Sequence, residues 1–125
     1  MKSEQKNRQE SVAENRLLNI VTDAIDDMKG VDMTVIDVRK MTSITDHMVI
    51  VSGTSSRHVK AIAENVEVHA KQAGYTPLGV EGKQTAEWVL IDLGDVVVHV
   101  MMPATREFYA LEKLWAVVGD HADNG

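Results

Sequence analysis

The segment Gly53–Arg57 (Gly-Thr-Ser-Ser-Arg) holds the first residues whose types and spacing could do chemistry. A glycine between a strand and a helix can bind phosphate, because the free amides and the dipole of the helix N-terminus favour anions. Capping of the helix by the hydroxyl side chains accounts for the same residues without a ligand. Because the spacing matches neither a Walker motif nor a dinucleotide fingerprint, the sequence favours capping.

A strand followed by Gly-Ser also begins the active site of nucleotidyltransferases, which hold magnesium with paired carboxylates. No Asp-x-Asp motif follows Gly53, and although Asp37 and Asp92 are candidate strand carboxylates, nothing in the sequence unites them. A nucleotide-binding or nucleotidyltransferase-like enzyme that uses the Gly53–Arg57 turn therefore stays open as the alternative function.

Other catalytic and metal-binding patterns are weak. His58 and His69 share a helix face but lie about 16 Å apart, too far to share one metal ion. A Ser-His-Asp triad can be assembled from Ser52, His99 and Asp92, but these residue types are too common in the chain to give the match weight. The sequence therefore predicts no catalytic, metal-binding or cofactor-binding residue.

Charge and composition narrow the class of protein. The net charge is −6 over 125 residues, whereas a freestanding nucleic-acid binder normally carries a basic excess or stripe. The acidic balance suits a small-molecule binder or a protein that meets a basic partner. Cysteine is absent, which excludes disulfides and thiol catalysis. The polar N-terminus and the lack of a membrane-length apolar run predict a cytoplasmic protein.

The segment Glu87–Met101 predicts two strands joined by a tight turn at Gly94-Asp95, and this turn fixes the pairing of the strands. On one face, six apolar residues oppose one another: Leu93 and Val96, Ile91 and Val98, Val89 and Val100. The other face opposes Asp92 to Val97, Leu90 to His99, and Trp88 to Met101. The first face is expected to be core, and the mixed face suits a surface that binds something, unless Trp88 simply packs under a helix.

The remaining elements alternate between helix and strand. Apolar periodicity predicts helices over 17–28 and 59–73, strands over 33–39 and 48–52, and an edge strand over 75–80. A last helix is expected after Pro103, with the stripe Phe108, Leu111, Leu114, Trp115 and Val118. The expected fold is one α/β domain over residues 1–125, a mixed sheet of about five strands flanked by helices, with flexible ends near 1–10 and 120–125.

Five segments occur in a specific order and spacing: Thr45-Asp46, Val49–Lys60, Gly79–Gly82, Glu87–Met101 and Arg106–Trp115. This ordered set resembles the ribosomal silencing factor family (RsfS, also called Iojap-like), over about residues 17–115. One departure is His47-Met48, where many members carry an aromatic pair.

The resemblance implies a regulator without enzymatic activity. Such a factor binds the large ribosomal subunit through ribosomal protein L-fourteen, sterically blocks association with the small subunit, and represses translation under nutrient limitation. The implied fold is nucleotidyltransferase-like without the catalytic carboxylates. No cofactor, membrane or sequence-specific nucleic acid is implied, and a homodimer is compatible with the family.

Carried onto this chain, the resemblance makes the mixed face of the hairpin the expected partner surface. Its residues are Trp88, Leu90, Asp92, His99 and Met101. Co-migration with large ribosomal subunits would favour the silencing factor, whereas magnesium-dependent nucleotide binding would favour the enzyme.

Overall fold

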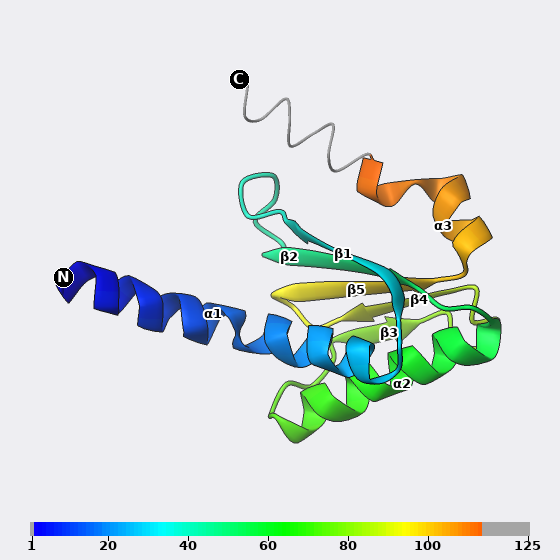
Figure 1. Ribbon diagram of the computed structural model, residues 1–125, viewed down its shortest axis with the longest axis horizontal. Helices are drawn as coiled ribbons and strands as arrows, with labels where there is room; N and C mark the ends of the chain where they lie inside the picture. Colours follow the sequence, from blue (N-terminus) through cyan, green and yellow to red (C-terminus); the bar gives the residue numbers. More distant parts are fainter. Residues whose placement is uncertain (1, 114–125) are drawn as a thin grey trace.

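A five-stranded sheet lies between helices in the computed structural model, which describes the backbone of residues 2–113 and the side chains of residues 15–113. Helices α1 (Lys2–Asp27) and α2 (Ser56–Gln72) cover one face, and the short α3 (Pro103–Tyr109) lies on the opposite side of the sheet (Figure 1). The strands are β1 (Val31–Asp37), β2 (His47–Ser52), β3 (Gly79–Glu81), β4 (Trp88–Asp92) and β5 (Val96–Met101). Within this part of the chain, no helix is long and apolar enough to cross a membrane.

The strands run across the sheet in the order β1-β2-β5-β4-β3. β2 pairs with β5 in parallel, and the other neighbouring pairs are antiparallel. This topology confirms the predicted α/β class with a mixed sheet of five strands. The edge strand β3 is shorter than the predicted 75–80 and begins at Gly79, because Pro77 lacks the N–H that a strand ladder needs.

The β4–β5 hairpin has the predicted register. Val89 pairs with Val100 and Ile91 with Val98, and the Leu93 amide donates to the Val96 carbonyl at 2.9 Å. Gly94 adopts a φ of +85°, which a side chain would disfavour, so the turn needs glycine there. All six predicted inward residues are at most 8% exposed.

The helix-covered face of the sheet holds the larger core. Apolar residues recur at helical spacing along α2, and those of α1 meet them over the sheet: Val59, Ile62, Ala63, Val66 and Ala70 with Leu17, Val21, Ala24 and Ile25. All six residues of β2 are buried, as expected for a central strand. Burial of this continuous apolar layer holds the sheet in place against α1 and α2. It thereby also determines the position of the side chains on the opposite face of the sheet.

The two terminal helices differ from the sequence prediction. α1 begins at Lys2, within the segment for which fraying was predicted. α3 ends at Tyr109 because Ala110 takes a left-handed conformation with a φ of +49°. The predicted apolar stripe is therefore wrong at Phe108, which is 81% exposed. The rest of that stripe beyond Leu111 lies outside the described residues.

Candidate functional site

The face of the sheet opposite α1 and α2, here called the open face, carries aligned rows of side chains. The strand register across β2, β5 and β4 sets three rows: Met48, Val97 and Asp92; Ile50, His99 and Leu90; Ser52, Met101 and Trp88. The predicted site residues therefore all lie on one face, because residues two apart on a strand point the same way.

Burial separates the five predicted site residues into two layers. Trp88, Leu90 and Asp92 on β4 are half-buried and so keep accessible surface. His99 is 7% exposed and Met101 is fully buried, in a small cluster with Val38, Met48 and Ile50. In this conformation Met101 supports the surface from below and offers no area for a partner to touch.

Trp88 is held in place by His99. The indole Nε1–H donates to His99 Nδ1 at 3.0 Å, and the ring centroids lie 5.8 Å apart. Because Nδ1 accepts this bond, the neutral imidazole carries its proton on Nε2. Burial lowers the pKa of His99 to about 4. Its Nε2 is buried without a hydrogen-bond partner among the described residues.

Two aromatic side chains of α3 continue the surface from Trp88. The Tyr109 ring lies 4.8 Å from the Trp88 ring between centroids, and Phe108 meets Tyr109 edge-on at 5.1 Å. The sequence predicts Phe108 as part of an apolar core stripe and indicates no role for the Tyr109 side chain. Helical periodicity missed them because it does not reveal that the helix stops at Ala110.

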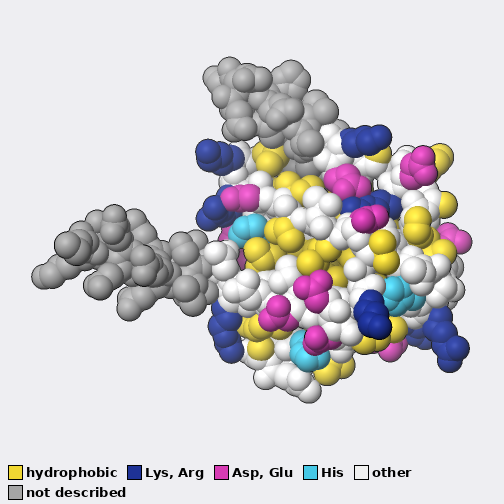
Figure 2. All heavy atoms as spheres, in the orientation of Figure 1, with side chains coloured by type: hydrophobic (Ala, Val, Ile, Leu, Met, Phe, Trp, Pro, Cys, Tyr) yellow, Lys and Arg dark blue, Asp and Glu magenta, His cyan; other side chains and the backbone are white. Residues whose placement is uncertain are grey.

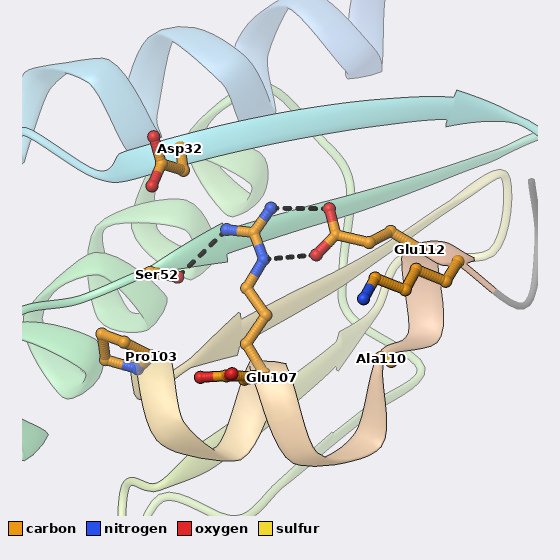
Figure 3. A pocket seen from close by; sticks show the side chains of 8 residues that line it. Asp32, Ser52, Pro103, Glu107, Ala110 and Glu112 are labelled. Atoms are coloured by element: carbon orange, nitrogen blue, oxygen red, sulfur yellow. Dashed lines mark hydrogen bonds and ion pairs between the residues drawn. The ribbon is translucent and has the colours of Figure 1, made fainter.

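A polar cluster fixes α3 to the sheet (Figure 3). The Arg106 guanidinium donates to Ser52 Oγ at 3.0 Å, to Thr34 Oγ1 at 3.1 Å, and to both carboxylate oxygens of Glu112 at 2.8 and 2.9 Å. We call these four residues the Arg106 cluster. Its ion pair lowers the pKa of Glu112 and raises that of Arg106. A cavity of about 320 Å³ opens beside it.

Asp92 has a structural bond as well as an accessible carboxylate. Its Oδ1 accepts from the Gly94 amide at 2.9 Å and so closes the hairpin turn. This bond engages one of the two carboxylate oxygens. The same residue can therefore fix the turn and still present negative charge on the open face.

The Gly53–Arg57 turn has the structure of a helix cap. Ser55 Oγ accepts from the His58 amide at 3.1 Å, and the Thr54 amide donates to His58 Nδ1 at 2.9 Å. A Cβ on Gly53 would lie 2.8 Å from the Val59 amide nitrogen, so the turn is closely packed. The amides of Thr54 and His58 are thus already bonded within the chain, as is that of Gly53, which donates to the Met101 carbonyl at 3.0 Å.

The remaining catalytic combinations do not assemble. Asp37 pairs with His47 in the strand register, on the helix-covered face, whereas Asp92 lies on the open face. Ser52 bonds to Arg106 and His99 to Trp88, so neither is arranged as part of a triad with Asp92. Among the side chains of residues 15–113, no three His, Cys, Asp or Glu groups gather as a metal site would require.

Figure 2 shows acidic and basic side chains interspersed with apolar ones on the side of the molecule that it presents. No continuous basic stripe crosses that view. The overall charge of −6 is consistent with this distribution. The described surface in this view therefore lacks the electrostatic footprint of a nucleic-acid binder.

Comparisons with known proteins agree with the resemblance. The family described as "Ribosomal silencing factor during starvation" matches residues 9–124. The ribosomal silencing factor RsfS of Haemophilus influenzae is 48% identical over 100 residues, which cover 80% of this chain and 98% of that protein. A crystal structure from Chromobacterium violaceum has a TM-score of 0.80 at 44% identity and covers 82% of this chain and 85% of its own. One from Bacillus halodurans has a TM-score of 0.75 at 39% identity, with coverage of 81% and 94%.

These matches span most of the chain, and their sequence identities of 39–48% relate the sequences as well as the folds. They confirm the family suggested by the five ordered segments of the sequence. This protein belongs to the ribosomal silencing factor family.

Proposed function

We propose that this protein binds the large ribosomal subunit through ribosomal protein L-fourteen and sterically blocks association with the small subunit. In the cytoplasm it would thereby repress translation under nutrient limitation. The observation that carries the proposal is Trp88, a half-buried aromatic side chain fixed between His99 and Tyr109 on the open face. Binding energy at interfaces concentrates on such aromatic anchors, and holding one in place beforehand reduces the entropy lost on binding.

Surface chemistry around Trp88 supports a protein partner. Leu90 and Asp92 lie beside it on β4, so the face combines apolar area with a negative charge. A chain with net charge −6 is attracted to a basic ribosomal protein and repelled by ribosomal RNA phosphates. His99 and Met101 contribute from beneath, by holding the accessible layer in position.

A steric mechanism fits the finding that the polar groups considered for catalysis are hydrogen-bonded within the protein. Ser52 and His99, the nucleophile and base of the triad considered with Asp92, are hydrogen-bonded to Arg106 and Trp88. The Thr54 and His58 amides of the α2 cap are also bonded internally. These bonds favour a regulator that acts by occupying space over the alternative of a nucleotide-handling enzyme.

Sedimentation of purified large subunits with this protein tests the binding step. Wild-type protein is expected to co-migrate with the large subunit, and Trp88→Ala should reduce the bound fraction. Val68→Ala is the matched control, because Val68 is an apolar residue of α2 that is 49% exposed on the opposite side of the sheet. Failure of the wild-type protein to co-migrate would contradict the proposal, and magnesium-dependent nucleotide binding would then favour the enzyme.

A further inference from the structure

We infer that α3 is a second docking element for the same ribosomal partner, with Phe108 as its exposed contact and the Arg106 cluster as the device that positions it. This inference rests on the proposed function. It assigns a role to a helix that contributes no buried side chain to the fold.

Phe108 is the observation that needs an explanation. Its side chain is 81% exposed, and that of Tyr109 is 53% exposed, although burial of aromatic side chains is strongly favourable. The centroid distances of 5.1 and 4.8 Å connect Phe108 through Tyr109 to Trp88. The three rings therefore extend the proposed interface from β4 onto α3, as one continuous aromatic surface.

The helix is fixed in spite of its small buried area. Arg106 reaches from α3 to Thr34 on β1 and to Ser52 on β2. Glu112 returns from beyond the helix to close the cluster, and Figure 3 shows its two bonds to Arg106 beside the bond to Ser52. At the start of α3, the Met102 amide donates to the Glu87 carbonyl at 2.8 Å, next to Trp88. Polar contacts at both ends thus hold the aromatic side chains at a defined place beside the sheet.

The charges near Phe108 indicate the chemistry of its partner. Glu107 is exposed beside it on α3, and Asp92 lies on the same open face as Trp88. An Arg or Lys side chain can cover an aromatic ring while its charge meets a carboxylate. The surface therefore fits a protein patch of apolar and basic side chains, whereas Glu107 would repel an RNA phosphate.

Equilibrium binding to purified large subunits at fixed salt tests the inference. Phe108→Ala should weaken binding by about tenfold or more, as expected for an interface aromatic. Its thermal midpoint should stay at the wild-type value, because the side chain is exposed. Val68→Ala again serves as the matched control and should change neither quantity.

A second variant separates the positioning of α3 by the Arg106 cluster from the direct contact made by Phe108. Glu112→Gln keeps the shape of the side chain but removes its charge, so the Arg106 cluster should loosen while Phe108 and Trp88 remain. We expect weaker binding in this variant. The double variant with Phe108→Ala should bind no worse than Phe108→Ala alone, because both changes remove the same contact.

The outcomes are distinguishable. If wild-type protein binds and Trp88→Ala weakens binding, but Phe108→Ala binds like wild type, the role of α3 is overturned while the proposed function stands. If the wild-type protein does not bind, the proposed function itself fails. A Phe108→Ala defect on whole subunits that is absent with purified ribosomal protein L-fourteen would place Phe108 against another component, such as RNA, and overturn the shared partner. Conversion of a free dimer to a monomer by Phe108→Ala would instead mark a self-association surface and overturn the inference.

Discussion

The two faces of the sheet are built from the same strands but bury their side chains in different ways. On the helix-covered face, Val49, Val98 and Ile91 have no exposed area and pack against α1 and α2. On the open face, half-buried Trp88 and Asp92 keep accessible surface and are held by hydrogen bonds. The helix-covered face therefore supplies most of the stability. The open face contributes less, because it keeps ordered side chains accessible to a partner. Substitutions on the two faces should separate stability from binding.

The largest expected effect is on stability from the helix-covered face. Ile91→Ala removes a fully buried side chain and leaves a cavity, so the free energy of unfolding should fall by about 4 kcal/mol. Urea denaturation measures this loss. Folded Ile91→Ala protein should still bind large subunits with wild-type affinity. A loss below about 1 kcal/mol would show that this face is not the main core.

The next effect concerns acid sensitivity on the open face. Burial holds the pKa of His99 near 4 in the folded protein, against the ordinary value of 6.5. The stability contributed by neutral His99 is therefore complete above pH 6.5 and is lost as pH falls toward 4. The shift corresponds to about 3 kcal/mol of unfolding free energy. Denaturation at a series of pH values measures it.

His99→Asn is the matched control for this loss, because its side-chain oxygen can accept from Trp88 Nε1 but does not titrate. Carboxylates such as Glu112, whose pKa is also lowered, contribute equally to the acid-induced loss of stability in both proteins. Subtracting the loss of the variant from that of the wild type therefore leaves the contribution of His99. The wild-type protein should lose more stability than His99→Asn between pH 6.5 and 4. Parallel curves would mean that folding does not hold His99 neutral.

Trp88 should affect binding more than stability. Trp88→Ala is expected to cost about 2 kcal/mol or more in affinity for the large subunit. The cost to the free protein should be smaller, because part of the side chain is already accessible to solvent before binding. Calorimetric binding and thermal unfolding give the two numbers. Trp88→Phe keeps a ring against Tyr109 but loses the bond to His99. Its affinity for the large subunit should therefore lie between those of the wild type and Trp88→Ala. Equal losses in both measurements would place Trp88 in the core.

The smallest expected effect comes from Asp92. Asp92→Asn retains an oxygen that can accept from the Gly94 amide, so the turn should survive while the charge is lost. If Asp92 meets a basic side chain of the partner, the affinity should become less sensitive to salt, with a change below about 1 kcal/mol at moderate ionic strength. Affinity measured across a salt series tests this. An unchanged slope would remove Asp92 from the set of interfacial charges.

Local signals predicted the hairpin well. Gly94-Asp95 fixed both the turn and the register, and strict alternation then assigned each residue to a face. The same rule brought Trp88 and His99 together on the open face. It could not predict their hydrogen bond, because the diagonal contact depends on side-chain rotamers that the register leaves free.

Non-local interactions explain what the sequence did not reveal. Periodicity extended the last helix through Phe108, but the chain breaks at Ala110 and places Glu112 against Arg106. Arg106 meets Ser52, which lies 54 positions away along the chain. Such a contact has no local signature. The buried position of Met101 was missed for the same reason, since its cluster contains Val38 and Met48, which lie far from it along the chain.

Subunit association followed by light scattering, as the concentration of this protein is raised, tests the central claim most directly. A steric blocker should inhibit in proportion to the fraction of large subunits occupied, with an end point near one factor per subunit, and should spare ribosomes that are already joined. Trp88→Ala should lose inhibition in step with lost binding, and Val68→Ala should not. Inhibition that keeps growing with time at far below one factor per large subunit would reveal a catalytic modifier and contradict the steric account.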